Sequence, residues 1–419
     1  MSTISRVTKN LNNPFIALRH KNFRYYWLGM CISLIGTWMQ NIAQPWLAYS
    51  LTKSPFLLSL VGALQFTPML LFSLFAGVFI DKFSKKKILL FTQSASLLIT
   101  LALAILIWTG KVQYWHILIA ATAIGCVNTL DMPARQSFVI ELVGKEDLMN
   151  AIALNSSVFN IARIIGPALA GVVMALAGVS ACFYANSISF AAVIIGLLFI
   201  KPIKIQTIKK INNKVLVDIK DGIKYILKDR LLFNTLVSTA IVGTFAMNFN
   251  VLIPVFAKVI LKQEETGFGF LMSFMGVGSF LGAMLIATLS KNGPKRFIMN
   301  VIPLFIALLL IFTGYTNAYV LTGLALAVTG LCFVSYSSTA NSILQLNTDD
   351  AYRGRVMSVY TLVFAGSTPI GNLYAGFITD HFGARRGFAA CGIIIILLFI
   401  LWYAFIRFYN PLRQDRSNI

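Results

Sequence analysis

Three ionisable side chains lie within long apolar stretches of the sequence: Asp131, Arg135 and Arg163. Asp131 and Arg135 are four residues apart in one stretch, so a helix would place them on one face, although Pro133 between them removes a backbone hydrogen bond. Arg163 lies in the next apolar stretch. An ionised group in an apolar layer is costly, and it usually contacts a partner or a water-filled cavity. These residues are therefore candidates for proton coupling or gating.

Asp131 and the nearby arginines fit two different roles. In the first, Asp131 takes up and releases a proton, because a cation that approaches or withdraws changes how tightly a buried acid holds its proton. Arg135 or Arg163 would be that cation. In the second role, the charges form a static latch in which Asp131 or Asp81 pairs with Arg135. The sequence leaves both hypotheses open.

The composition places these charges in a membrane protein. Of the 419 residues, 58% are hydrophobic and only 12% are charged, whereas soluble domains carry about 25% charged residues. A membrane-spanning helix needs about 20 mostly apolar residues. We expect an all-α membrane protein with twelve spanning helices, at residues 24–51, 55–80, 87–109, 114–138, 148–178, 180–200, 231–260, 266–290, 296–315, 318–343, 353–379 and 386–408.

The net charge of +21 also fits a membrane protein. A soluble protein with this charge would be expected to bind nucleic acid, but the cytoplasmic loops of membrane proteins carry an excess of lysine and arginine. Placing both termini in the cytoplasm puts most of the basic residues on that side. We therefore expect cytoplasmic termini, contact with the lipid bilayer and no nucleic-acid partner. A monomer is the expected oligomeric state, although the charge does not bear on it.

The residue groupings used by enzymes and metal sites are not found in the sequence. The five cysteines stand singly in apolar stretches without metal-ligand spacing, and none of the three histidines lies in the middle of a predicted span. There is no Ser/His/Asp grouping, and the glycine-rich stretch GVGSFLGAM has no Gly-Lys-Ser/Thr step for nucleotide phosphates. We expect neither an enzyme nor a bound metal.

A basic segment, residues 201–230, divides the chain into two halves. Its apolar residues recur at helical spacing, which predicts a short helix on the inner membrane surface, with a solvated linker as the alternative. The predicted division is a cytoplasmic N-terminus, a six-helix bundle, the linker, a second six-helix bundle and a cytoplasmic tail, at residues 1–23, 24–200, 201–230, 231–408 and 409–419.

The two halves are related by a repeat of 205 residues. This offset superimposes small residues, for example Gly166 on Gly371 and Gly178 on Gly383. Such a parallel repeat is typical of transporters built from two halves. The charges do not repeat, because Arg163 falls on Thr368. Symmetric packing therefore does not explain Arg163.

The loop after the second predicted span reads GVFIDKFSKKK. Its defining residues are Gly77, Asp81, Lys82, Lys85, Lys86 and Lys87. The pattern resembles the loop signature of the major facilitator superfamily, with Ser84 where glycine is usual. The resemblance implies two pseudo-symmetric six-helix halves that work by alternating access. It also implies a cytoplasmic latch in which the aspartate faces a helix N-terminus, whose dipole favours a carboxylate.

The stretch NIARIIGPALAG in the fifth predicted span carries a second resemblance. Ala162, Gly166, Pro167, Ala170 and Gly171 resemble the Gly-Pro-rich antiporter motif of that superfamily, with alanine at some positions where glycine is usual. Small residues permit close helix packing, and proline bends the helix. With the preceding NTLDMPARQSF, the stretch resembles the bacterial macrolide-efflux and enterobactin-exporter subgroup.

The resemblance to that subgroup implies a multi-pass exporter in the bacterial inner (plasma) membrane. Such a protein would need no cofactor, because an ion gradient, with protons as the candidate ion, would drive it. Importers and lipid or lysolipid flippases share this fold, and the fold does not fix direction. Gradient-coupled import of a small solute and lipid flipping therefore stay open as alternatives.

A substrate cavity between the two halves would be lined by polar and aromatic residues of several spans. The candidates are Trp38, Gln40, Asn41, Gln44, Asn155, Asn160, Asn248, Asn250, Asn341 and Asn372. Amides and aromatic rings with few net charges suit an amphiphilic small molecule, such as a drug, a macrolide or a siderophore-like compound.

Overall fold

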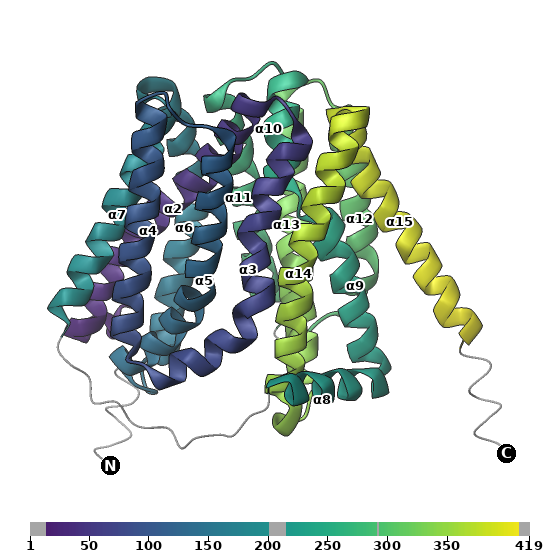
Figure 1. Ribbon diagram of the computed structural model, residues 1–419. Coiled ribbons are helices and arrows are strands. Elements are labelled where there is room, and N and C mark those ends of the chain that lie inside the picture. The colour runs from purple at the N-terminus through teal and green to yellow at the C-terminus, as the bar shows by residue number, and fades with distance from the viewer. Residues whose placement is uncertain (1–13, 201–214, 291–292, 410–419) are drawn as a thin grey trace, which may run out of the picture. The chain divides into compact units, whose positions relative to one another are not determined.

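The computed structural model describes residues 14–200, 215–290 and 293–409. These residues form helices joined by short loops, and no strand occurs among them (Figure 1). Within this part of the chain, ten segments are long and apolar enough to cross a membrane. The helices at residues 21–52 and 350–382 have the length of a span but are not among the ten. The count of twelve spans and the cytoplasmic termini therefore stay predictions.

The helix bounds follow the apolar stretches of the sequence closely. In chain order the elements are η1 (Ile16–Arg19), α2 (Lys21–Thr52), α3 (Pro55–Lys82), α4 (Lys85–Trp108), α5 (Tyr114–Val143), α6 (Leu148–Ala177), α7 (Val179–Phe199), α8 (Val215–Lys228), α9 (Arg230–Ala246), α10 (Phe249–Val259), α11 (Glu265–Leu289), α12 (Arg296–Tyr315), α13 (Tyr319–Leu346), α14 (Asp350–Phe382) and α15 (Ala384–Tyr409).

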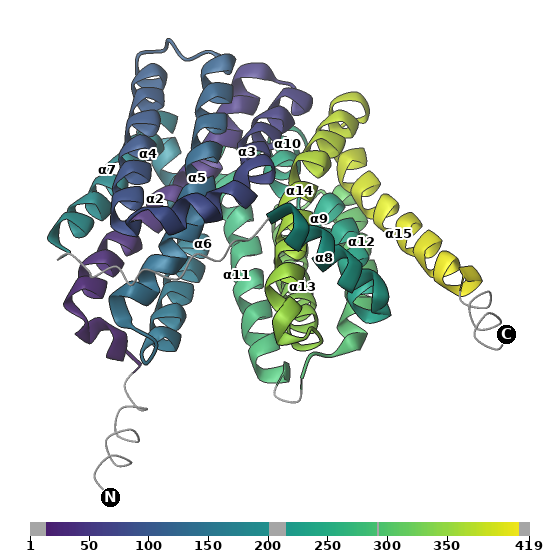
Figure 2. The same cartoon turned by 60° about the horizontal axis from the view of Figure 1, so that its bottom comes forward.

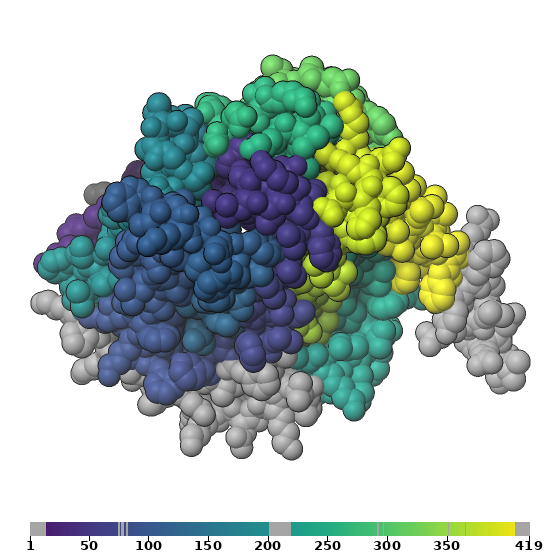
Figure 3. Space-filling view, turned by 45° about the horizontal axis from the view of Figure 1, so that its top comes forward, coloured from purple at the N-terminus to yellow at the C-terminus, as the bar shows by residue number. Residues whose placement is uncertain are grey.

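The chain divides into two compact units. The first comprises residues 1–47 and 67–212, and the second comprises residues 48–66 and 213–419. In the space-filling view, the blue part of the first unit, to which α4 and α5 belong, presents a closely packed surface (Figure 3). The boundary at residue 212 falls inside the predicted linker. Residues 48–66, which comprise the end of α2, the connection to α3 and the first part of α3, group with the second unit instead. Ser54 Oγ in that connection donates to Asp380 Oδ1 of α14 (2.8 Å).

Two glycine pairs at the predicted offset of 205 residues occupy equivalent positions in the helices. Gly178 ends α6 and Gly383 ends α14, with φ angles of 80° and 87° that side chains rarely tolerate. Gly166 and Gly371 each pack directly on the first helix of their own half. A Cβ on Gly166 would lie 2.5 Å from Trp38 Cβ, and one on Gly371 would lie 1.8 Å from the Thr244 carbonyl. The structure thus confirms these equivalences of the repeat.

The seventh predicted span matches an apolar segment long enough to cross a membrane, Arg230–Val259, but its helix is interrupted. Residues 231–260 were expected to form one helix, but α9 ends at Ala246 and α10 begins at Phe249. Asn248 stabilises the break, because its Nδ2 donates to the carbonyls of Thr244 (2.9 Å) and Phe245 (3.4 Å). Such carbonyls at a helix end otherwise lack partners. Hydropathy does not reveal this capping.

The linker contains the helix that the apolar spacing predicts. Residues 215–228 form α8, and within the second unit α8 runs crosswise to α9 and α14 (Figures 1 and 2). Ile226 of α8 is buried with Leu232, Leu344 and Val356. Its location at a membrane surface stays a prediction. The rest of the linker, residues 201–214, lies outside the described part of the chain.

Candidate functional site

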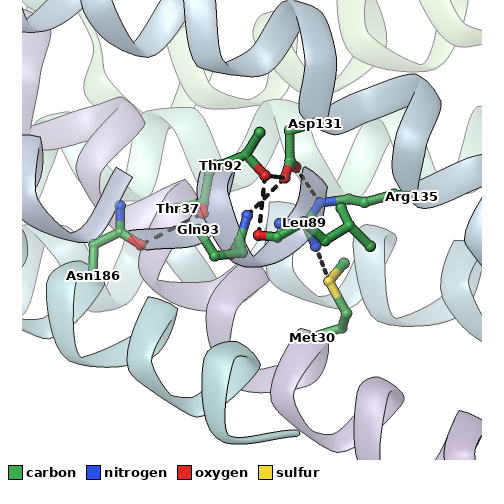
Figure 4. A network of polar contacts seen from close by, with 8 residues as sticks. All are labelled: Met30, Thr37, Leu89, Thr92, Gln93, Asp131, Arg135 and Asn186. Atoms are coloured by element: carbon green, nitrogen blue, oxygen red, sulfur yellow. Dashed lines mark hydrogen bonds and ion pairs between the residues drawn. The ribbon is translucent and has the colours of Figure 1, made fainter. Parts of the chain in front are cut away.

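The carboxylate of Asp131 is held by three donors inside the first unit (Figure 4). Its Oδ1 accepts hydrogen bonds from Thr92 Oγ1 (2.6 Å) and Gln93 Nε2 (2.8 Å), both on α4. Its Oδ2 pairs with Nε of Arg135, one turn further along α5. Nη1 of Arg135 also contacts the sulfur of Met30 on α2. The charged pair therefore joins three helices.

Burial makes this pair energetically important. The side chains of Asp131 and Arg135 are only 8% and 18% exposed. A buried charge without a partner costs several kcal/mol, whereas paired and hydrogen-bonded charges are tolerated. Asp131 and Arg135 lie on one helix, α5, which continues through Pro133. Rigid motion of α5 cannot separate them.

Arg163 is in a different situation. It lies near the middle of the 30-residue helix α6, and its Nη2 donates to Oδ1 of Asn160 (3.2 Å) one turn earlier. Nδ2 of Asn160 donates to the carbonyl of Ser156 (2.8 Å), which fixes the amide in place. Nε of Arg163 is buried without a hydrogen-bond partner. Among the described residues, no carboxylate neutralises this guanidinium.

The small residues of α6 form a packing surface, as predicted. Ala162, Gly166, Pro167 and Ala170 are buried. Gly166 lies against Trp38 of α2, where any side chain would collide with the Trp38 Cβ. Trp38 also packs edge-on against Phe159 of α6, with ring centroids 5.7 Å apart. Gly171 lies on the same helix and is buried as well.

Pro167 has a local consequence for Arg163. A proline has no N–H, so the carbonyl four residues earlier in the helix, that of Arg163, loses its usual backbone donor. α6 nevertheless continues to Ala177. The same residue thus combines an un-neutralised guanidinium with a weakened backbone hydrogen bond. This part of α6 is the candidate site at which a ligand would gain most from contact.

Three of the lysines predicted for the loop after α3 form the first turn of α4 instead, and two of them contact other helices of the first unit. Lys85 Nζ pairs with Glu141 Oε1 at the end of α5 (3.5 Å). Lys86 Nζ donates to the carbonyl of Ile200 at the end of α7 (2.8 Å), and Lys87 is exposed. These contacts tie the ends of α4, α5 and α7 together. Gly77, Asp81 and Lys82 belong to the last turns of α3, and their role in a latch stays a prediction.

The predicted cavity residues of the first unit differ in exposure. Gln40 and Gln44 are buried, whereas Trp38, Asn41, Asn155 and Asn160 are half-buried. Oε1 of Gln40 accepts hydrogen bonds from Asn186 Nδ2 of α7 (2.6 Å) and from Thr100 Oγ1 of α4 (3.3 Å). These bonds join α2 to its neighbours. The side-chain oxygen of Gln40 therefore binds neighbouring helices, and its role in a substrate cavity stays a prediction.

The predicted cavity residues of the second unit show the same variety. Asn248 and Asn372 are buried, Asn341 is half-buried and Asn250 is exposed. Asn248 caps the end of α9, and Asn341 Oδ1 accepts from Gln345 Nε2 (2.5 Å). A Cβ on Gly62 would lie 2.5 Å from Nδ2 of Asn372, so that amide packs on α3. A cavity shared by the two sets stays a prediction.

Sequence reasoning missed several partners of these residues. Thr92, Gln93 and Asn186 are polar residues in apolar stretches, and this rarity was the available signal. Asp147, in the loop before α6, was also missed. Its Oδ2 accepts from Nε of Arg19 (3.1 Å) and lies 2.6 Å from Nε2 of His20, so it anchors η1.

The chain matches known transporters over almost its whole length. The sequence profile of a family described as transmembrane secretion effectors matches residues 12–416. The staphyloferrin A transporter of Staphylococcus aureus is 27% identical over 94% of this chain and 98% of the relative. Macrolide efflux protein A of Streptococcus pyogenes is 22% identical over 90% of this chain and 94% of the relative. The multidrug efflux pump Tap of Mycolicibacterium fortuitum is 22% identical over 87% and 90%.

Solved structures show the same fold at lower identity. The nucleoside transporter NupG superimposes with a TM-score of 0.75 at 11% identity, over 91% of this chain and 98% of that chain. A bacterial homologue of the human lysosomal transporter Spinster, in an inward-facing conformation, superimposes with a TM-score of 0.73 at 10% identity, over 90% and 95%. These similarities bear on the fold alone.

Proposed function

Because the chain belongs to the transmembrane secretion effector family of the major facilitator superfamily, whose members are transporters rather than enzymes, we propose that it exports a small amphiphilic molecule. The proposed exporter works by alternating access in a bacterial inner membrane and exchanges its substrate for protons. Two relatives whose names describe efflux support the direction. A drug, a macrolide or a siderophore-like compound is the proposed substrate class.

Arg163 is the observation that carries the proposal. A charged arginine at the centre of a membrane helix is disfavoured by about 3 kcal/mol on insertion scales. In the described structure only the neutral amide of Asn160 binds its guanidinium. An uncompensated charge of this kind marks a position where substrate or water enters the protein. We assign Arg163 to substrate contact, with Asn160 as the residue that positions it.

Asp131 fits the latch role better than the role of proton carrier. A carrier must exchange its partners as the protein changes state, but Arg135 shares a helix with Asp131, and both Thr92 and Gln93 come from the adjacent α4. Motion of one half against the other leaves all four together. We therefore propose that this cluster holds the first unit rigid and that protons are carried elsewhere.

The test is a drug-susceptibility and dye-efflux screen in cells that lack the chain or express it, with and without a protonophore. Expression should raise tolerance to at least one amphiphilic compound, and the protonophore should abolish that gain. Arg163→Gln should lower the gain at least tenfold at equal membrane abundance, and Arg163→Lys should retain part of it. Asn41→Ala, a change of a predicted cavity residue on α2, is measured in the same screen for comparison.

The alternatives predict other outcomes. Accumulation of a solute that requires the chain would establish import, and movement of labelled lipid in proteoliposomes would establish flipping. If no compound is exported, the proposal of export is wrong. If export occurs but is unchanged in Arg163→Gln, export stands and the assignment of Arg163 is wrong.

A further inference from the structure

The outer face of α8 combines exposed lysines with exposed apolar residues. Lys220, Lys224 and Lys228 recur every four residues and are all exposed. Ile223 and Leu227 are 42% and 57% exposed. At about 100° per residue, the two apolar residues and the three lysines fall on adjacent arcs of the helix. The exposed side of α8 therefore consists of an apolar strip beside a basic strip.

The opposite face of α8 is already occupied by the second unit. Tyr225 stacks on Tyr352 of α14, with ring centroids 4.5 Å apart. Asp221 Oδ2 lies 3.5 Å from Nη1 of Arg355. Gly222 touches the backbone of α14, since a Cβ there would lie 2.8 Å from the Arg355 carbonyl. The orientation of α8 is therefore fixed, and the lysine face is held outward.

The connection to α9 sets the depth of α8. α8 ends at Lys228, and the apolar span that contains α9 begins two residues later, at Arg230. Between them, Asp229 caps α9 by accepting hydrogen bonds from the N–H groups of Leu231 (2.7 Å) and Leu232 (3.1 Å). Because α8 runs crosswise to this span (Figures 1 and 2), a membrane crossed by α9 would lie parallel to α8, and its surface would lie at the level where the span starts. A helix of this kind places its apolar side among acyl chains and its basic side among headgroups.

We propose that the outer face of α8 binds anionic phospholipids, with Lys220, Lys224 and Lys228 contacting the headgroup phosphates. Ile223 and Leu227 insert beside the acyl chains. The occupant is a lipid leaflet because the helix emerges at the start of a membrane span. Charge complementarity selects anionic lipids, since the only acidic residue among the described side chains of α8, Asp221, faces Arg355. This inference does not depend on the direction or substrate of transport.

Native mass spectrometry of the purified full-length chain tests the proposal. The protein is equilibrated in detergent with equal amounts of phosphatidylglycerol and phosphatidylcholine, and retained lipids of each kind are counted. Each basic residue near an anionic surface contributes about fivefold to binding. We expect wild type to retain phosphatidylglycerol preferentially, and Lys220→Gln/Lys224→Gln/Lys228→Gln to lower that preference at least fivefold. The triple lysine-to-arginine variant should keep it.

Two further variants separate specific binding from general charge. Lys53→Gln/Lys111→Gln/Lys262→Gln removes the same charge from exposed lysines in other loops and should leave the preference unchanged. Ile223→Ser/Leu227→Ser should reduce retention of both lipids without changing their ratio. The proposal is overturned if the α8 lysine variant selects phosphatidylglycerol as wild type does, or if the two triple glutamine variants lose the preference equally.

Discussion

Replacing Asp131 by leucine should destabilise the protein by about 3–5 kcal/mol, because it leaves the buried guanidinium of Arg135 without a counter-charge. The carboxylate and guanidinium side chains are 8% and 18% exposed, so water replaces little of the lost interaction. Arg135→Met should cost less, since Thr92 and Gln93 still donate to the remaining carboxylate. The unequal cost follows directly from the geometry.

The double variant Asp131→Leu/Arg135→Met completes the cycle. It removes both charges and leaves the amide of Gln93 without its acceptor, at about 1 kcal/mol, whereas the Thr92 hydroxyl can still donate to the Leu89 carbonyl (3.2 Å). We expect it to be more stable than Asp131→Leu alone, with a coupling energy of about 3 kcal/mol. Reversible unfolding in mixed detergent micelles, followed by circular dichroism, gives these free energies. A stability of Asp131→Leu within about 1 kcal/mol of wild type, or additive effects of the two single changes, would refute the buried-pair account.

Asp131→Asn should keep proton-driven transport per folded molecule while lowering stability; loss of coupling with intact substrate movement would instead make Asp131 the proton carrier. Gly166→Ala should lower the free energy of unfolding by about 1–3 kcal/mol, because the new Cβ would collide with Trp38. Gly354→Ala is the control: no atom lies near that position, so the same unfolding assay should show no change or a gain of up to about 1 kcal/mol. Asp147→Ala should release η1 and speed proteolysis near residues 14–20. Unchanged cleavage would mean that the contacts of Asp147 with Arg19 and His20 do not stabilise η1.

Helix positions were largely predictable because membrane spans require long apolar stretches, which leave a strong signal in the sequence. The repeat was predictable at Gly178 and Gly383 because helix ends with positive φ strongly favour glycine. The break at Asn248 was not predictable, since it depends on an amide that bonds backward to its own helix. Hydropathy scores that amide only as one polar residue among apolar ones.

The candidate site was predictable in part for a similar reason. The pairing of Asp131 with Arg135 follows from their spacing of four residues. The role of Gln40 does not follow from spacing, because its partner Asn186 is distant in sequence and lies on α7. A polar residue in an apolar stretch can face a substrate or another helix, and only the three-dimensional packing distinguishes these cases.

The most direct test of proton-coupled export uses everted membrane vesicles containing the chain and a compound identified by the efflux screen. An imposed pH gradient, acidic inside, should drive the compound into the vesicles against its concentration gradient. Collapse of that gradient by a protonophore should stop accumulation, and vesicles with Arg163→Gln should accumulate at most a tenth as much. Accumulation that persists without a pH gradient, or that is absent from wild-type vesicles with one, would contradict the account.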